Sequence, residues 1–209
     1  MNGHFRTVLL LTVGGCAGAP NAPADDLPVL HRRIGRDPSD AEAHLRLGLL
    51  WARAGDGLRA QQYLEKAWAL GADPRRSLPP LIRVSLALSS WEAALRHAEV
   101  FSDLLAHTCA TRPSAEACAD AAEALSTAAA LHDSLGHPLR ARDLFLAALR
   151  TDPRLADAYL GLARLQAEGL GDPQAARETL RRGLLAVLNE RHTSKLRTRL
   201  ADLDSGDPR

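Results

Sequence analysis

The sequence predicts an all-α fold built from antiparallel pairs of helices. Ala, Leu and Arg dominate the 209 residues, whereas aromatic residues make up 4% and Val, Ile, Thr and Tyr are sparse, which favours helix over strand. Small and large apolar residues recur at helical spacing on common faces. Gly and Asp-Pro sequences punctuate the chain between these segments, as expected where helices end.

The first residues do not belong to this predicted fold. The apolar run at residues 7–13 is too short to span a bilayer and has the layout of a secretory signal. The sequence Val13-Gly14-Gly15-Cys16 resembles the lipobox of bacterial lipoproteins, in which the cysteine is lipidated and cleavage occurs just before it. This resemblance implies that residues 1–15 are a signal peptide and that Cys16 carries a lipid anchor. The alternative is an ordinary signal that is cleaved near Ala19.

A tether and a short helix are predicted to follow. Residues 16–28 contain several Pro and Ala residues without periodicity, which is typical of a flexible linker. Leu27, Val29, Leu30 and Ile34 then indicate a short helix that ends near Gly35. The helical solenoid is expected to cover residues 29–204, and a disordered tail the residues 205–209.

The first full helix pair is predicted within residues 39–74. Its first helix spans residues 41–54 with Asp40 as the N-cap, and its second helix spans residues 58–70. The turn between them is Gly55-Asp56-Gly57. Small residues stand at spacings of 12 and 7, where two crossing helices would leave room only for Gly or Ala: Gly48, Ala60 and Ala67.

The same spacings recur at Ala129, Ala141 and Ala148, with Phe145 as the large residue between the last two. The stretch from His132 to Pro153, which contains most of this pattern, resembles the second half of a tetratricopeptide repeat (TPR), a helical hairpin of about 34 residues. The resemblance implies a right-handed superhelix of such hairpins. The repeats would lie at about 39–74, 75–108, 114–153 and 154–189, followed by a capping helix.

Three departures from this period are expected to change the structure. In the second repeat, Pro79-Pro80 should shorten or displace the first helix. Ala141 follows Ala94 by 47 residues, and the 13 surplus residues are assigned to a connection at residues 107–119. The fourth repeat, with Ala163, Ala176 and Gly183, has a first spacing of 13, and its extra residue is placed in the turn at residues 169–173.

Two cysteines remain for a disulfide if Cys16 is lipidated. Outside the cytoplasm disulfides persist, and Cys109 and Cys118 lie close in the sequence. We expect Cys109 after the end of one helix and Cys118 in the first turns of the next, so that a chain reversal at residues 111–113 brings them together. Two alternatives stay open: two buried free thiols, or a metal site with His97 and His107, which the absence of Cys-x-x-Cys spacing disfavours.

The TPR resemblance also implies a concave groove, lined by the first helix of each pair, that binds a protein partner. A clamp of Lys and Asn residues for a carboxylate is absent, because Leu45 and Leu49 stand where it would need polar groups. A mixed apolar and acidic groove favours an extended or helical peptide. The alternative is that both leucines pack against the N-terminal segment. By register, the groove residues are Glu42, Leu45, Leu49, Ala52, Arg53, Glu123, Ser126, Ala130, Asp133, Asp157, Leu160, Arg164 and Glu168.

The sequence gives no sign of catalysis. It has no nucleotide-binding loop, no His-Glu-x-x-His, no Gly-x-Ser-x-Gly and no dinucleotide fingerprint, so no catalytic residue, cofactor or metal is predicted. A net charge of +1, from 26 basic and 25 acidic residues, provides no bulk attraction for nucleic acid.

The combined resemblances imply an adaptor or scaffold, anchored by lipid in a bacterial envelope at the periplasmic side of the outer membrane. It is similar to small TPR lipoproteins that help to place or stabilise machines such as pilus secretins. Two other functions stay open. The chain could regulate cell-wall enzymes by binding them, or it could be a thiol redox or metal-binding protein that uses Cys109 and Cys118.

Overall fold

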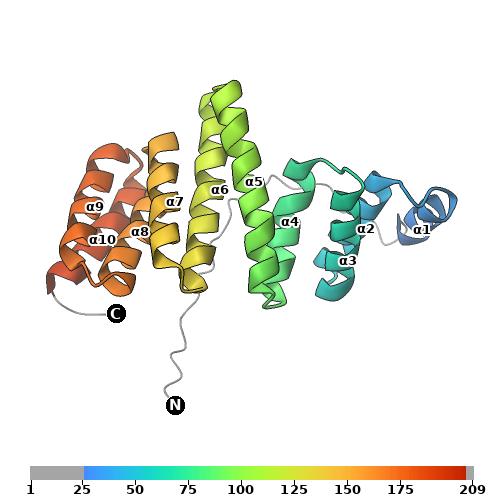
Figure 1. Cartoon of the computed structure of the whole chain (residues 1–209), viewed down its shortest axis with the longest axis horizontal. Coiled ribbons are helices and arrows are strands. Elements are labelled where there is room, and N and C mark those ends of the chain that lie inside the picture. Colours follow the sequence, from blue (N-terminus) through green and yellow to red (C-terminus); the bar gives the residue numbers. More distant parts are fainter. Residues whose placement is uncertain (1–25, 206–209) are drawn as a thin grey trace, which may run out of the picture.

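The computed structural model describes residues 26–205 as a row of helices joined by short turns (Figure 1). The predicted signal peptide and Cys16 lie outside these residues, as does most of the predicted tether. In the described part no segment forms a strand, and no helix is long and apolar enough to cross a bilayer. The elements are α1 (Asp26–Arg36), α2 (Ala41–Arg53), α3 (Gly57–Ala69), α4 (Pro74–Ala87), α5 (Trp91–Thr111), α6 (Ala115–Ser134), α7 (Pro138–Thr151), α8 (Ala156–Arg164), the π-helical turn η1 (Leu165–Gly169), α9 (Pro173–Ala186) and α10 (Glu190–Ser205).

The helices form four antiparallel pairs, α2–α3, α4–α5, α6–α7 and α8–α9, with α1 before the first pair and α10 against α8 and α9 (Figure 1). The all-α, TPR-like superhelix is therefore confirmed. The apolar core is divided among several clusters along the row, and the largest joins residues from α6 to α10. Such a division is expected for a solenoid, in which each unit contacts only its neighbours.

The first pair forms as its sequence predicts. The Asp40 side chain accepts a hydrogen bond from the backbone N–H of Ala43 at 2.9 Å, which caps α2. A Cβ atom added to Gly48 would lie 2.6 Å from Cγ of Leu64, so only glycine allows α2 and α3 to approach this closely. Ala60 and Ala67 are fully buried at the same contact.

The second pair corrects the expectation for Pro79-Pro80. Both prolines lie inside α4, which has 14 residues against 13 in α2 and begins 33 residues after it. The first helix is therefore neither shortened nor displaced. Leu78 and Leu81 are fully buried between α4 and its neighbours, and this burial outweighs the loss of two backbone donors to proline.

The 13 surplus residues do not form a long connection, which corrects the second expectation. They lengthen α5 to 21 residues and α6 to 20, and only residues 112–114 join the two helices. Figure 1 shows this hairpin projecting beyond the other pairs. Its interface consists mostly of small side chains, which lets the two helices pack closely over their length: Ala94, Ala98, Ser102, Ala121, Ala124 and Ala128.

The extra residue of the fourth pair is also placed differently from the expectation. It lies in the π-helical turn η1 at the end of α8, where the N–H of Leu170 donates to the carbonyl of Leu165 at 2.9 Å, five residues back. The turn that follows is unchanged in length. In the first, third and fourth pairs a glycine with positive φ stands two residues before the second helix: Gly55, Gly136 and Gly171.

Ser89 takes this turn position in the second pair, with φ of 57°. A left-handed backbone is unfavourable for residues with a Cβ atom, so the turn keeps its geometry at a cost that glycine avoids. All four turns therefore have a residue with positive φ at the same position, and in three of them that residue is glycine.

Candidate functional site

The first helices of the pairs form the inner face of the superhelix. Helix α2 contacts α4, α6 contacts α8, and α8 contacts α10, whereas the second helices α3, α5, α7 and α9 contact one another less within the described residues. In a curved stack the elements on the concave side lie closer together. The groove that the sequence predicts therefore corresponds to the surface formed by α2, α4, α6 and α8.

Ion pairs connect the successive first helices across this inner face. Helix α2 is joined to α4, α4 to α6, α6 to α8, and η1 to α10. Each pair bridges one step of the stack. The partners are Glu42 and Arg76 at 2.8 Å, Arg75 and Asp120 at 2.9 Å, Asp133 and Arg164 at 2.8 Å, and Glu168 and Arg199.

Glu42 has the most complete set of partners in this series. Its two carboxylate oxygens accept from the two terminal nitrogens of Arg76, at 2.8 and 3.0 Å, and Oε1 also accepts from Nε of Arg46 at 3.0 Å. The hydrogen bonds from Arg76 lower the pKa of Glu42, against the opposing effect of partial burial, and Arg46 lowers it further. The carboxylate therefore stays ionised, with its acceptors occupied, and is a structural group rather than a free contact for a partner.

Glu123 and Asp157 are different, because neither carboxylate has an ion pair within the described part of the chain. Both are exposed on the inner face, on α6 and α8, one repeat period apart. The side chain of Glu123 reaches solvent, but neighbouring protein atoms partly bury its carboxyl group. This partial burial raises the pKa of Glu123. The negative charges of Asp120 and Asp157 raise this pKa further. The site thus holds a local excess of negative charge that a cation would relieve.

The structure corrects two of the predicted groove residues. Leu45 has no exposed surface and Ser126 only 6%, so neither lines an open groove. Leu45 packs against α3 and α4, within the cluster that contains Leu64 and Leu78, and not against the N-terminal segment. Both interpretations of Leu45 are therefore wrong. Its position faces the next repeat rather than solvent.

The other predicted residues lie partly open. Leu49 and Leu160 are half-buried beside their clusters, so each presents an edge to the inner face. Arg53 is exposed, and its Nε donates to the carbonyl of Leu49 at 3.3 Å. Arg164 is held by Asp133. Glu123 and Asp157 are therefore the predicted residues that the structure brings together as an open polar site.

Sequence reasoning missed the cations that complete the ion pairs, Arg75, Arg76 and Arg199, and the acid Asp120. A signal for them was present. Glu42 and Arg76 stand 34 residues apart, which is one repeat period, so opposite charges at matching positions of adjacent repeats mark such a bridge.

Cys109 and Cys118 are joined by a disulfide in the structure, with their Cα atoms 4.9 Å apart. Cys109 lies inside the last turn of α5 rather than after its end, which corrects that expectation, and Cys118 lies in the first turns of α6. The bond therefore closes the tip of the projecting hairpin. Whether it forms in the cell stays a prediction. No group of three or more metal-ligating side chains is found in residues 26–205.

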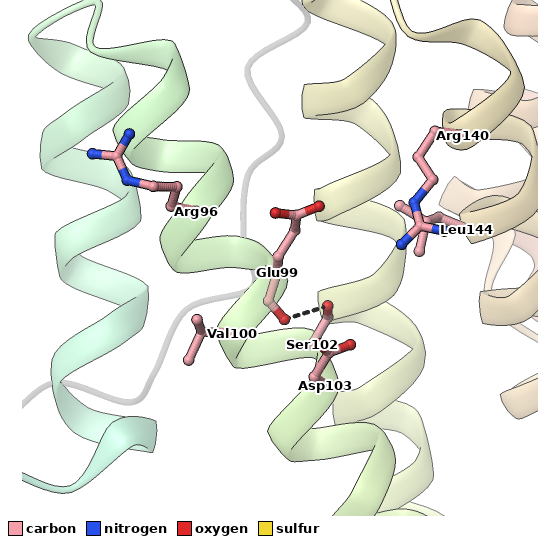
Figure 2. Close-up of a pocket in the computed structure, with 7 residues that line it drawn as sticks. All are labelled: Arg96, Glu99, Val100, Ser102, Asp103, Arg140 and Leu144. Atoms are coloured by element: carbon pink, nitrogen blue, oxygen red, sulfur yellow. Dashed lines mark hydrogen bonds between the residues drawn. The ribbon is translucent and has the colours of Figure 1, made fainter.

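An open pocket of about 430 Å³ lies between α5 and α7 (Figure 2). Glu99, Asp103, Arg96 and Arg140 line it, and Ser102 donates a hydrogen bond to the carbonyl of Glu99 at 2.9 Å. Its two acidic and two basic side chains balance in charge, so the pocket has no preference for an anion or a cation. We assign it no ligand.

Comparison with known proteins identifies the fold. No protein-family model matches the sequence, and no curated protein matches it. A crystal structure of MamA aligns with a TM-score of 0.60 and 18% identity, over 80% of this chain and 82% of MamA. Residues 41 to the end of MamA from Desulfovibrio magneticus RS-1 align at 0.58 with 20% identity, over 90% and 89%. PilF from Pseudomonas aeruginosa aligns at 0.57 with 18% identity, over 84% and 74%. Identities this low show a shared fold alone.

Proposed function

We propose that this chain is a non-catalytic binding scaffold of the bacterial envelope, and that its inner face holds a protein partner through a basic segment. The observation that carries the proposal is the contrast on the inner face itself. Glu42, Asp120, Asp133 and Glu168 each have an arginine partner from a neighbouring element. Glu123 and Asp157 have no such partner among the described residues, and they face the same surface.

A partner cation fits this site for electrostatic reasons. A Lys or Arg side chain between Glu123 and Asp157 would offset the repulsion that now raises the pKa of Glu123. Hydrogen bonds to charged groups contribute about 1.5–3 kcal/mol each. The half-buried edges of Leu49 and Leu160 supply apolar contact on the same face, which suits an extended or helical peptide that has both basic and apolar residues.

The anchor part of the proposal is supported by the lipobox resemblance at Cys16. A lipidated Cys16 would place the scaffold at a membrane surface, and the adjoining tether would let it reach a membrane complex. The proposed role is the assembly or stabilisation of an envelope complex such as a pilus secretin. A regulator that binds cell-wall enzymes would use the same anchor and the same face, so the identity of the partner distinguishes the two roles.

The partner site is tested by crosslinking in membranes, affinity purification and mass spectrometry. A Glu123→Lys, Asp157→Lys variant should lose the partner that the wild type retains, because like charges would then face each other. The matched control is Glu92→Lys, Glu116→Lys, which makes the same charge change at exposed sites at the start of α5 and at the hairpin tip. Equal recovery of one partner by all three proteins would refute the inner-face site.

The anchor is tested separately by labelling cells with palmitate. Cys16→Ser should abolish incorporation into the protein, because the lipobox cysteine provides the acceptor thiol. Equal labelling of the wild type and the variant would contradict the lipoprotein proposal and leave the partner site untouched.

A further inference from the structure

The two most exposed large apolar side chains among the described residues lie together at the C-terminal end of the stack. Leu185, at the end of α9, is 85% exposed, and Leu188, between α9 and α10, is 87% exposed. They stand three residues apart, while Leu184, Ala186 and Val187 around them pack into the core. Exposed apolar groups in such proximity are typical of an interaction site.

The local backbone holds these leucines outward. Val187, between them, is buried with 4% exposed surface, and its N–H donates to the carbonyl of Gly183 at 2.9 Å. Asn189 then caps α10, since its Oδ1 accepts from the N–H of Arg191 at 3.0 Å. Val187 and Asn189 therefore hold the backbone on both sides of Leu188, whose side chain is left exposed.

Basic residues of α9 and α10 flank the two leucines along the chain. Four of them are exposed and have no ion pair within residues 26–205. Two further arginines of the same two helices are occupied, since Arg177 binds Asp204 and Arg199 binds Glu168, whereas Arg197 is exposed like the four. The acids Glu178 and Glu190 lie nearby and offset part of the positive charge. We call this surface the C-terminal patch; it comprises Leu185 and Leu188 with Arg181, Arg182, Arg191 and Lys195.

We propose that the C-terminal patch docks on an anionic phospholipid surface. The basic side chains would contact phosphate headgroups, and the leucines would enter the boundary between headgroups and acyl chains. A lipid surface fits better than a protein, because side chains that are nearly fully exposed protrude and have no walls to hold a peptide. A fluid membrane needs only a protruding apolar group with cations beside it.

This site goes beyond the proposed scaffold function and does not depend on the Cys16 anchor. The patch and α1, which follows the anchor segment in sequence, lie at opposite ends of the stack (Figure 1). A protein held at both ends would lie along the bilayer instead of standing away from it. The inner face would then be presented at a fixed height above the membrane.

Vesicle binding by the full chain carrying Cys16→Ser tests the proposal without the lipid anchor or any partner. Sedimentation is measured with vesicles of phosphatidylcholine alone and of phosphatidylcholine mixed with phosphatidylglycerol. The anionic vesicles should bind the protein, and salt should weaken the binding. The residues before α1 are common to all variants, so differences between variants report on the patch.

Two patch variants and one control separate the contributions. Arg181→Gln, Arg182→Gln, Lys195→Gln should weaken binding by roughly a hundredfold, since each basic residue near an anionic surface strengthens binding by about fivefold. Leu185→Ser, Leu188→Ser should weaken it by about tenfold or more. The control Leu58→Ser, Leu139→Ser changes leucines that are 73% and 60% exposed at other sites, and it should bind as the parent does.

Three results would overturn the proposal. The first is equal binding to neutral and anionic vesicles, or no binding to either. The second is patch variants that bind like the control. The third is a leucine variant that changes the oligomeric state in analytical ultracentrifugation and leaves vesicle binding unaltered, which would assign the patch to a second copy of the chain. Circular dichroism checks the fold of each variant. If the leucine variant misfolds, the variant of Arg181, Arg182 and Lys195 still tests the proposal, because it changes exposed charged side chains only.

Discussion

Two regions of the superhelix depart from the repeat period, and they absorb their extra residues in different ways. The fourth pair has one extra residue and places it in η1, inside the first helix. The region around α5 and α6 has 13 extra residues and lengthens both helices, with no long loop between them. In both regions the turns keep their short length. Helices satisfy their own backbone groups, so extra residues are accommodated there more easily than in a buried turn.

The size of the insertion explains the difference. One residue added to a regular helix turns everything beyond it by about 100° and would move the buried side chains off the core, whereas a π turn takes up one residue locally. Helix α5 has 21 residues against 13 in α3, and α6 has 20 against 14 in α4. These additions of eight and six residues, less one residue in the shorter connection, account for the 13 extra residues. They extend the two helices at the tip of the hairpin, so the buried face of each helix is preserved without a π turn.

Single-residue deletions should show the largest contrast between a regular and a π-containing helix. Deleting Ala52 from α2 would rotate the end of α2 relative to the turn at Gly55, and should cost more than about 3 kcal/mol in the free energy of unfolding. Deleting Ala167 from η1 should restore a regular helix and cost no more than about 1 kcal/mol, chiefly by disturbing the hydrogen bond from Thr179 to Gln166. Urea unfolding measures both; equal losses would mean that η1 does not absorb the insertion.

Removal of the disulfide should have the next largest effect, confined to the lengthened pair. Cys109→Ser, Cys118→Ser opens a short loop and should reduce stability by roughly 2–3 kcal/mol, on the chain-entropy model. Hydrogen exchange should quicken at the tip of α5 and α6 and stay unchanged in α2 and α3. Mass spectrometry of a non-reduced digest provides the control, and two free thiols in wild type purified without reductant would contradict the disulfide prediction.

The turn of the second pair should respond more weakly. Ser89→Gly removes the strain of a positive φ and should stabilise the protein by about 0.5–1 kcal/mol. Gly55→Ser is the matched reversal, because a Cβ atom at Gly55 would meet nothing within 4 Å and only the backbone preference changes. Thermal melts should move in opposite directions for the two variants. A shift in the same direction would show that the turns do not share one backbone requirement.

The smallest effect is expected at Glu123. Its raised pKa means that the unfolded chain releases this proton more readily than the folded chain, so the group lowers stability as pH rises above the ordinary carboxyl pKa. Glu123→Gln should therefore be slightly more stable than the wild type at neutral pH, and the difference should vanish in acid. Glu178→Gln on α9 is the control. A gain that persists unchanged at low pH would exclude titration of Glu123 as the cause.

The sequence was sufficient for the helix pairs wherever small residues kept their spacing. Asp40 and Gly48 each have the local role that their residue type predicts, because caps and close crossings depend on near neighbours. The prediction from Pro79-Pro80 was wrong, because burial of the apolar side chains of α4 outweighs the tendency of proline to end a helix. The inner face was harder to predict. Whether Leu45 meets solvent or the next repeat, and which arginine reaches Glu42, depends on the rotation between repeats, which the period alone does not specify.

The ion pairs of the inner face are also contacts between repeats that salt can weaken. Each is a bridge between partly exposed side chains, of a kind that contributes only about 0–1 kcal/mol and is weakened by salt. The apolar clusters between the helices do not depend on charge, so they keep neighbouring helices packed when the bridges across the inner face weaken. Rising ionic strength should therefore weaken these bridges and leave the apolar clusters as the main contacts that set the curvature of the stack.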